Sequence, residues 1–272
     1  MPPMKFHENN IGEDVLEVLV KNIPGLRSAL AANHLVAVRL LRQWVTQFGN
    51  GSDWTTDRCS GDAARRRLSL DGHIYFAQEK ESGLCCAGFP DFFAKLCSAF
   101  GYPAAELGVG LWNSGGGLSH ALTLVEIPGK GCPEVYACDP YLNFEYGMEG
   151  QEHSPFLQVV RALLLGQAGP IQVDGFQETV RDIVHHVEHK SAFVTGSAMD
   201  ADAWFFSYDK SQDRAQLAAI LDLPVENLCT FHLLLSPLYL HPLQRSKGLQ
   251  NAISEYATIL REHGLRAFEP SS

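Results

Sequence analysis

The sequence predicts an α+β fold in which helices pack on an antiparallel sheet. Two segments of the first half, residues 33–48 and 91–100, carry apolar side chains at every third or fourth position, as an amphipathic helix does. Short apolar runs between glycine and proline clusters then indicate strands joined by turns. These runs cover residues 107–112, 121–127 and 134–138. Because helical and extended segments are grouped and do not alternate, a doubly wound parallel sheet is not expected.

Residues that favour helix ends mark the boundaries of the two helices. Asn33 is a predicted N-cap for the first helix, which Gly49-Asn50-Gly51 ends. The second helix follows Gly88-Phe89-Pro90 and ends at Gly101. The polar residues 52–72 between the two helices are predicted to form a loop.

The second half of the chain is predicted to be rich in helix. Helical patterns cover residues 155–166, 176–190, 212–221 and 246–262, and two short apolar segments, 204–206 and 233–235, are compatible with strands. A chain of 272 residues is long enough to bury a core without disulfides or metals. We expect a catalytic core over residues 20–150 and a helix-rich C-terminal portion over residues 151–272 that packs beside the active-site cleft.

Composition excludes two classes of partner. The chain carries 21 Lys and Arg against 31 Asp and Glu, a formal net charge of −10, which disfavours binding to nucleic acid or to anionic membranes. Its first fifteen residues contain no apolar segment typical of a secretory signal. No apolar run reaches the ~18–20 residues that a membrane span needs. We therefore expect a cytoplasmic protein.

The seven cysteines do not predict a disulfide framework, because their number is odd and two of them are adjacent. Cys132 and Cys138 lack the spacing of a zinc knuckle, and no second pair completes four ligands. His185 and His189 share one face of a predicted helix at a spacing that can hold a metal, but no further ligand is evident. We expect no metal and no cofactor, and reduced cysteines of which one can be a nucleophile.

Three residues suited to thiol catalysis occur in order between residues 83 and 143. Cys86 lies at the N-terminus of the second predicted helix, His120 begins a predicted strand and Asp139 ends the next one. A helix N-terminus and a neighbouring imidazolium lower the pKa of a thiol. The histidine can return the proton to a leaving group while an aspartate fixes its tautomer. We therefore predict a Cys86–His120–Asp139 triad, with two antiparallel strands holding the last two residues side by side.

These residues resemble the transglutaminase-like superfamily of papain-type cysteine enzymes. Its members have a nucleophilic cysteine that opens a helix, a short Gly-Tyr-Pro-Ala type of sequence after that helix, a strand that begins with histidine and a terminal Asp-Pro. The matching residues here are Cys86, Gly101-Tyr102-Pro103-Ala104, His120-Ala121, Glu126 and Asp139-Pro140. The resemblance implies a papain-like core, with the nucleophile's helix packed on an antiparallel sheet. It also implies acyl transfer or amide-bond chemistry through a cysteinyl thioester.

Two features of the family leave the nucleophile open between neighbouring cysteines. The family's Gly-x-Cys pattern favours Cys85, which follows Gly83 by two residues. The fifteen-residue step to Gly101 and the phenylalanine three residues downstream favour Cys86, which we take as the nucleophile. The aromatic residue that often follows the histidine by two positions is replaced by Leu122. The second oxyanion donor is also open, between Gln78 and Trp54.

Two alternatives differ from this hypothesis in chemistry. Arylamine N-acetyltransferases share the order Cys, His, Asp, but the chain lacks their Arg-Gly-Gly before the cysteine and their Asp-Val-Gly-Phe after the strand. A non-catalytic binding or scaffold domain would not need all three triad residues. The expected partners are an acyl donor (a peptide, an amide or a thioester, free or bound to a carrier protein) and an amine or water as acceptor. The triad does not distinguish hydrolysis from amide formation.

Overall fold

A computed structural model describes the helices and strands of this chain together with the turns that join many of them. The described residues are 15–46, 70, 88–111, 118–141, 144–148, 151, 154–165, 168–171, 218–219, 222, 234–244, 246–265 and 267. The helices are α1 (Val15–Asn22), α2 (Leu26–Ala32), α3 (His34–Thr46), α6 (Gly88–Ala99), α7 (Phe156–Leu164) and α11 (Lys247–Glu262). The strands are β1 (Ala104–Leu111), β2 (Leu118–Ile127), β3 (Glu134–Asp139), β4 (Phe144–Met148), β5 (Ala168–Ile171) and β6 (Pro237–Pro242).

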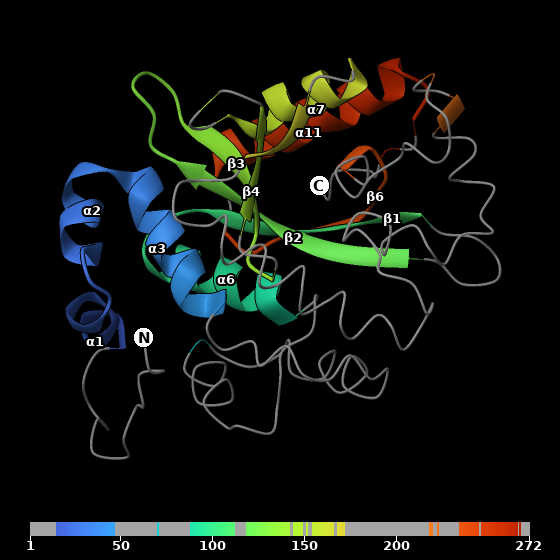
Figure 1. Ribbon diagram of the computed structural model, residues 1–272. Coiled ribbons are helices and arrows are strands. Elements are labelled where there is room, and N and C mark those ends of the chain that lie inside the picture. Colours follow the sequence, from blue (N-terminus) through green and yellow to red (C-terminus); the bar gives the residue numbers. More distant parts are fainter. Residues whose placement is uncertain are drawn as a thin grey trace.

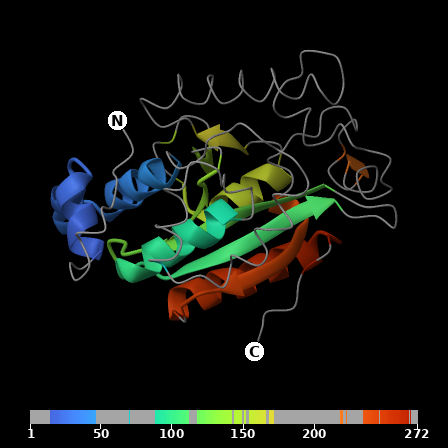
Figure 2. The same cartoon turned by 90° about the horizontal axis from the view of Figure 1, so that it is seen from below.

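The described strands form one six-stranded sheet in the order β5-β4-β3-β2-β1-β6. Every neighbouring pair is antiparallel. Helices cover both faces of the sheet: α3 and α6 lie on one face, and α7 and α11 lie on the other (Figure 1). Figure 2 shows α6 in front of the long strand β2 when the molecule is viewed from below. The predicted α+β class is therefore confirmed.

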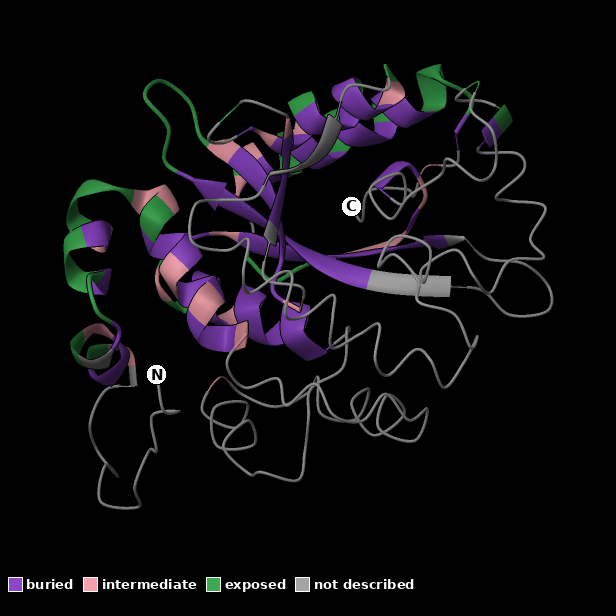
Figure 3. Ribbon diagram, in the orientation of Figure 1, coloured by how far each residue is buried: buried purple, intermediate pink, exposed green. Residues whose placement is uncertain are grey.

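Each face of the sheet has its own hydrophobic core, and the buried residues lie where the helices meet the strands (Figure 3). We call the first the α3–α6 core; its members include Val38, Leu41, Trp44, Phe89, Phe92, Leu96, Val125 and Cys138. The second, the α7–α11 core, includes Leu107, Val109, Leu122, Leu124, Ala137, Phe156, Val160, Tyr256 and Leu260. Each fully buried Leu or Phe side chain contributes roughly 1.5–3 kcal/mol. Both faces of the sheet are thereby stabilised.

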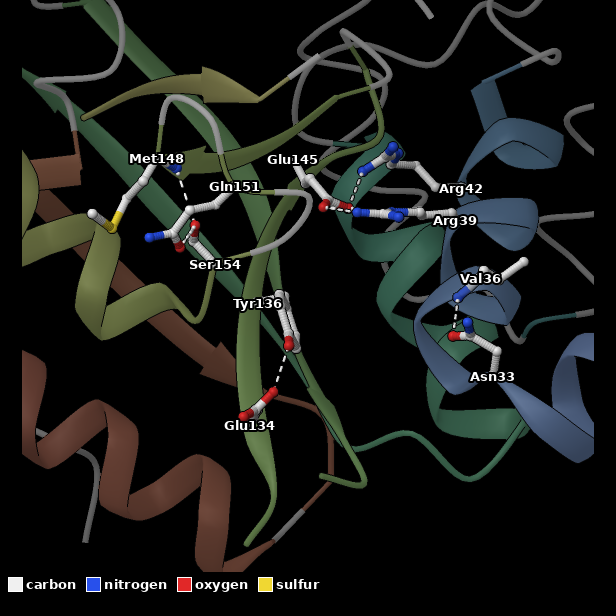
Figure 4. Close-up of polar contacts among 10 residues, drawn as sticks. All are labelled: Asn33, Val36, Arg39, Arg42, Glu134, Tyr136, Glu145, Met148, Gln151 and Ser154. Carbon is white, nitrogen blue, oxygen red and sulfur yellow. Dashed lines mark hydrogen bonds and ion pairs between the residues drawn. The ribbon is translucent and has the colours of Figure 1, made fainter. Parts of the chain in front are cut away.

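The two helices predicted in the first half are present, although α6 already begins at Gly88 and the predicted end of the first helix at Gly49-Asn50-Gly51 lies outside the described residues. The Oδ1 of Asn33 accepts a hydrogen bond from the backbone N–H of Val36 at 3.2 Å, at the start of α3 (Figure 4). Gly101 follows α6 with φ +82°, a left-handed conformation that glycine adopts without steric cost. The N–H of Tyr102 then bonds to the carbonyl of Cys97 at 2.9 Å, which closes the helix end. Both helices begin or end within three residues of the predicted positions.

The predictions for the second half hold where the residues are described, with one exception. Helices α7 and α11 match the patterns at 155–166 and 246–262. The strand expected at 233–235 is wrong for Leu234 and Leu235, which form a buried 3₁₀ turn before β6. Ser236 then bonds to Gly110 of β1, through its hydroxyl at 2.7 Å and its carbonyl at 2.9 Å, and β6 begins at the next residue. The patterns at 176–190 and 204–206 lie outside the described residues.

Residues after 150 belong to the same sheet as those before it. β5 and β6 are its two edge strands, and α7 and α11 pack on one of its faces. No helix in the described parts of the chain is long and apolar enough to cross a membrane.

Candidate active site

The structure describes one residue of the predicted triad in full, one in part and one not at all. Asp139 ends β3 and is completely buried. The backbone of His120 lies in β2, and only its place in the sheet is described. Cys86 lies two residues before the start of α6, outside the described residues. The alternative nucleophile Cys85 and the two candidate oxyanion donors, Gln78 and Trp54, also lie outside them.

His120 and Asp139 occupy the same end of two neighbouring antiparallel strands. β2 and β3 are in register at Thr123 and Cys138, so one more pair sets Asp139 across from Leu122. His120 is two residues beyond Leu122 along β2, which makes it a diagonal neighbour of Asp139. Diagonal positions in such a ladder are separated by about 7–8 Å, a distance that long or aromatic side chains can span.

The first turn of α6 lies against this end of the sheet. The ring of Phe89 packs edge-on against Tyr141, in the turn after β3, with 5.6 Å between the ring centroids. The hydroxyl of Thr123 on β2 donates to the carbonyl of Pro90 at 3.1 Å. The N-terminus of α6 and the turn after Asp139 therefore lie side by side, and Cys86 precedes this helix by two residues in the sequence.

The alternation of β2 determines on which face each position lies. Thr123 contacts α6, whereas its neighbour Leu122 is buried in the α7–α11 core. The register pairs His120 with Val109, a member of the same α7–α11 core. Asp139 falls across from Leu122. The positions of His120 and Asp139 therefore belong to one face of the sheet, and α6 covers the other.

Asp139 is followed by a turn that two hydrogen bonds hold in place. Its Oδ1 accepts from the backbone N–H of Tyr141 at 3.0 Å. The hydroxyl of Thr46, at the end of α3, lies 2.8 Å from the carbonyl oxygen of Pro140. The same hydroxyl lies 2.9 Å from the carbonyl of Arg42, so one proton is shared between two acceptors. The backbone after Asp139 is thus tied to a helix from the first part of the chain.

A buried ion cluster anchors the neighbouring strand β4 to α3 (Figure 4). Glu145, which pairs with Cys138 in the sheet, accepts from Arg39 Nε at 3.0 Å and from Arg39 Nη2 at 2.5 Å. Arg42 Nη1 lies 3.4 Å from the same carboxylate. All three charged side chains are buried. The two-point contact with Arg39 fixes the angle as well as the distance between helix and strand.

The two buried cysteines that the structure describes, Cys97 and Cys138, are not activated thiols. Burial raises the pKa of Cys138 to about 12; Arg42 and Arg39 oppose this shift, and Glu145 adds to it. Burial also raises the pKa of Cys97, and the nearby Cys138 adds to that shift. Cys132 is exposed. A nucleophile that is ionised near neutral pH is therefore not Cys97 or Cys138.

Glu126, which belongs to the family resemblance, has a structural role. Its Oε2 accepts from the backbone N–H of Leu249 at 2.6 Å and from the hydroxyl of Ser246. Both partners lie at the N-terminus of α11, where a carboxylate is favoured by the helix dipole. Glu126 therefore holds the last helix of the chain against the sheet.

The residues that support Asp139, namely Thr46, Arg39, Arg42 and Glu145, are absent from the sequence-based site. Arg39 and Arg42 stand among apolar residues in the sequence of α3, which is a signal for a buried acidic partner. This signal does not identify the partner. Within the described residues, no group of three or more His, Cys, Asp or Glu side chains could hold a metal ion. His185 and His189 lie outside these residues. Comparisons with protein-family models, with curated proteins and with solved structures find no match to this chain.

Proposed function

We propose that this protein is a cysteine-dependent acyltransferase or amidohydrolase with a transglutaminase-like core, acting through Cys86, His120 and Asp139. The observation that carries the proposal is the meeting of three elements at one end of the sheet. His120 and Asp139 are diagonal neighbours on adjacent strands, and the first turn of α6 contacts the turn after Asp139. The order and spacing of the three residues in the sequence support the same assignment.

The proposed reaction has two acyl-transfer steps. The Cys86 thiolate attacks the carbonyl carbon of an amide or thioester, and the bond to the leaving group breaks as the His120 imidazolium gives that group a proton. The acyl group is then held on Cys86 as a thioester. An amine or water attacks this thioester, His120 takes the proton of the attacking group, and the thiolate leaves. Asp139 orients the imidazole and stabilises its charged form.

The alternation of β2 sets a geometric requirement for this mechanism. α6 covers the face opposite to the His120 position, so the triad requires Cys86 to meet His120 past the end of the helix. His120 lies three residues beyond Thr123, which contacts the first turn of α6. Three residues of a strand extend about 10 Å. The histidine position therefore lies past the helix end, and the mechanism requires Cys86, two residues before α6 in the sequence, to lie there as well.

Selective alkylation tests the proposal, because the described cysteines provide internal standards. The folded protein is treated with iodoacetamide at about pH 6–7, where a thiol of ordinary pKa is mostly protonated, and the modified sites are followed by mass spectrometry. We expect Cys86 to react before the exposed Cys132, and the buried Cys97 and Cys138 to remain unmodified. A scaffold domain would instead show Cys132 reacting first, which would refute the proposal.

Two matched variants assign the reactive residue. Cys86→Ser should remove the fast labelling and the activity, because a serine hydroxyl is not ionised by a site suited to a thiol. Cys85→Ser, the same change one residue earlier, should keep both. The reverse result would transfer the nucleophile's role to Cys85. His120→Ala should lower turnover by roughly two to four orders of magnitude, and near-normal turnover in a folded variant would remove His120 from the mechanism.

A trapping experiment separates hydrolysis from transfer. The protein is incubated with simple amide and thioester donors, and the covalent adduct is measured by intact-mass spectrometry. Hydroxylamine should release the acyl group as a hydroxamate, as expected for a thioester. Adding a primary amine should divert the acyl group to an amide if the second step is transfer, whereas the free acid should remain the product if it is hydrolysis.

A further inference from the structure

We propose that Thr46, in the last turn of α3, is a positioning residue for Asp139; this inference rests on the function proposed above. The Thr46 hydroxyl lies 2.8 Å from the carbonyl oxygen of Pro140, the residue that follows Asp139. On the other side of that peptide group, the Asp139 carboxylate accepts from the N–H of Tyr141 at 3.0 Å. The peptide group between Pro140 and Tyr141, directly after the residue that carries the carboxylate, is therefore held at both its carbonyl and its N–H.

Thr46 is attached to a helix that is itself fixed to the sheet. Arg42 and Arg39, one and two turns before Thr46, bind Glu145 with buried charges at both ends. Glu145 pairs with Cys138, the residue before Asp139. α3 thus holds β4 through an ion cluster and the turn after β3 through Thr46. A hydroxyl on such a rigid element can fix the direction of a neighbouring carboxylate.

A threonine inside a helix commonly bonds to the carbonyl four residues earlier, and Thr46 also approaches Arg42 in this way. That local bond needs no partner elsewhere in the chain. The contact with Pro140 is different, because it spans 94 residues and reaches the residue next to the triad. Thr258 on α11 makes the local bond, to the carbonyl of Ser254 at 3.0 Å, and contacts no distant carbonyl among the described residues, so it provides a matched control.

The chemical consequence concerns the charge state of the nucleophile. An aspartate beside a histidine stabilises the imidazolium, and the imidazolium in turn stabilises the thiolate. If Asp139 loses its orientation, the imidazolium is less stable and the thiolate of Cys86 forms only at higher pH. In a plot of the Cys86 alkylation rate against pH, the low-pH limb, where the rate rises as the thiolate forms, should therefore move to higher pH. A residue that only stabilises the fold would lower the unfolding temperature without moving this limb.

The experiment measures the rate of Cys86 modification by iodoacetamide in the full chain, between about pH 4 and pH 9. In Thr46→Val we expect the low-pH limb to move upward by roughly one pH unit, which makes the reaction about tenfold slower on that limb. Thr46→Ser, which keeps the hydroxyl, should restore the wild-type profile. Thr258→Val should leave the profile unchanged. Thermal unfolding of each variant confirms that the protein measured is folded.

The outcomes separate this inference from the proposed function. If the wild type labels Cys86 selectively and Thr46→Val keeps the wild-type profile, Thr46 does not position Asp139, although the proposed function stands. If the wild type labels no cysteine selectively, the proposed function and this inference both fail. Should the valine variant not fold, Thr46→Ala removes the same hydroxyl without adding a methyl group, and its profile decides in the same way.

Discussion

At the scale of single residues, burial decides the chemistry of the thiols in the sheet and in α6. Cys138 lies beside Arg42 and Arg39, whose positive charges favour a thiolate, yet its pKa is raised to about 12. The cost of removing a charge from water is therefore larger than the attraction of two guanidinium groups that also share Glu145. Cys97 shows the same direction of shift. Both thiols remain protonated and unreactive near neutral pH.

The raised pKa of Cys138 predicts a loss of stability in alkaline solution. In the unfolded chain the thiol ionises near its ordinary value of 9.0, whereas in the folded protein it ionises near 12. The unfolded state therefore loses its proton first, and the free energy of unfolding falls from about pH 9 upward, by up to about 1.4 kcal/mol per pH unit for one such thiol. Below pH 9 this contribution is fully present.

Urea unfolding at several pH values from about 7 to 11 measures this slope. Cys138→Ala should give a shallower alkaline decline than the wild type. Cys132→Ala, the same change at an exposed cysteine, should keep the wild-type slope. Equal slopes in all three proteins would show that Cys138 is not protonated above its ordinary pKa.

Sequence patterns predict the buried apolar residues of α3 but not its buried charges. Leu41 and Val45 follow the helical spacing, and both are buried. Arg39 and Arg42 are buried as well, because Glu145 approaches them from a strand more than 100 residues later. A local pattern carries no information about so distant a partner. The role of Thr46 cannot be predicted from the sequence for the same reason, because its contact with Pro140 exists only in the folded chain.

At the scale of elements, α11 is fixed at its N-terminus by two oxygen acceptors that are bonded to each other. The Ser246 hydroxyl accepts from the N–H groups of Gly248 at 3.1 Å and Leu249 at 3.4 Å. Glu126 on β2 accepts from Leu249 and from the serine hydroxyl itself. A Cβ at Gly248 would lie 2.6 Å from the Glu126 carboxylate, so a larger residue there would force this carboxylate to shift. The capping group therefore connects the last helix to the central strand.

We predict that Ser246→Ala destabilises the protein by about 1–2 kcal/mol, because it removes the helix cap and one partner of a buried carboxylate. Ser254→Ala, the same change at an exposed position inside α11, should be neutral or slightly stabilising, since alanine is the better helix former. Urea unfolding of the two variants makes the comparison. Equal midpoints would show that the Ser246 cap does not stabilise α11.

The elements that sequence analysis predicts are those with strong local signals. α3 and α6 have a clear helical spacing and capping residues, and β1, β2 and β3 lie between glycine and proline turns. β4, β5 and β6 are short strands at or next to the edges of the sheet, and no pattern in the sequence predicts where they begin and end. β6 begins at Pro237 because its pairing with β1, more than 100 residues earlier, selects where the strand starts. Such pairings are a property of the folded chain and have no local pattern.

At the scale of the whole molecule, the two halves of the chain build one sheet and one pair of cores. β6 extends the edge at β1, and β5 extends the edge at β4. α7 and α11 bury Phe156 and Tyr256 against each other, with 4.8 Å between the ring centroids. His120 and Asp139 thus lie on strands that are packed on one face by helices from the second half of the chain. The segments proposed for catalysis depend on residues far from the site.

This arrangement predicts that residues 1–150 do not fold alone, although they contain the whole proposed triad. Removing the rest of the chain exposes one face of the sheet, including Leu107 and Leu122, and deletes partners such as Phe156, Tyr256 and Leu260. Each of these three buried side chains contributes roughly 1.5–3 kcal/mol, so their loss is comparable with the whole 5–15 kcal/mol stability of a typical domain.

Circular dichroism and amide NMR dispersion of a chain ending at residue 150 measure this directly, with the full chain as the reference. We expect no cooperative thermal transition for the short chain and no selective alkylation of Cys86. Adding a second polypeptide that covers residues 151–272 should restore both, because the missing helices and edge strands can then pack on the open face and edges of the sheet. A cooperative transition in the short chain alone would instead show that residues 20–150 form an independent core, and that the second half only packs beside it.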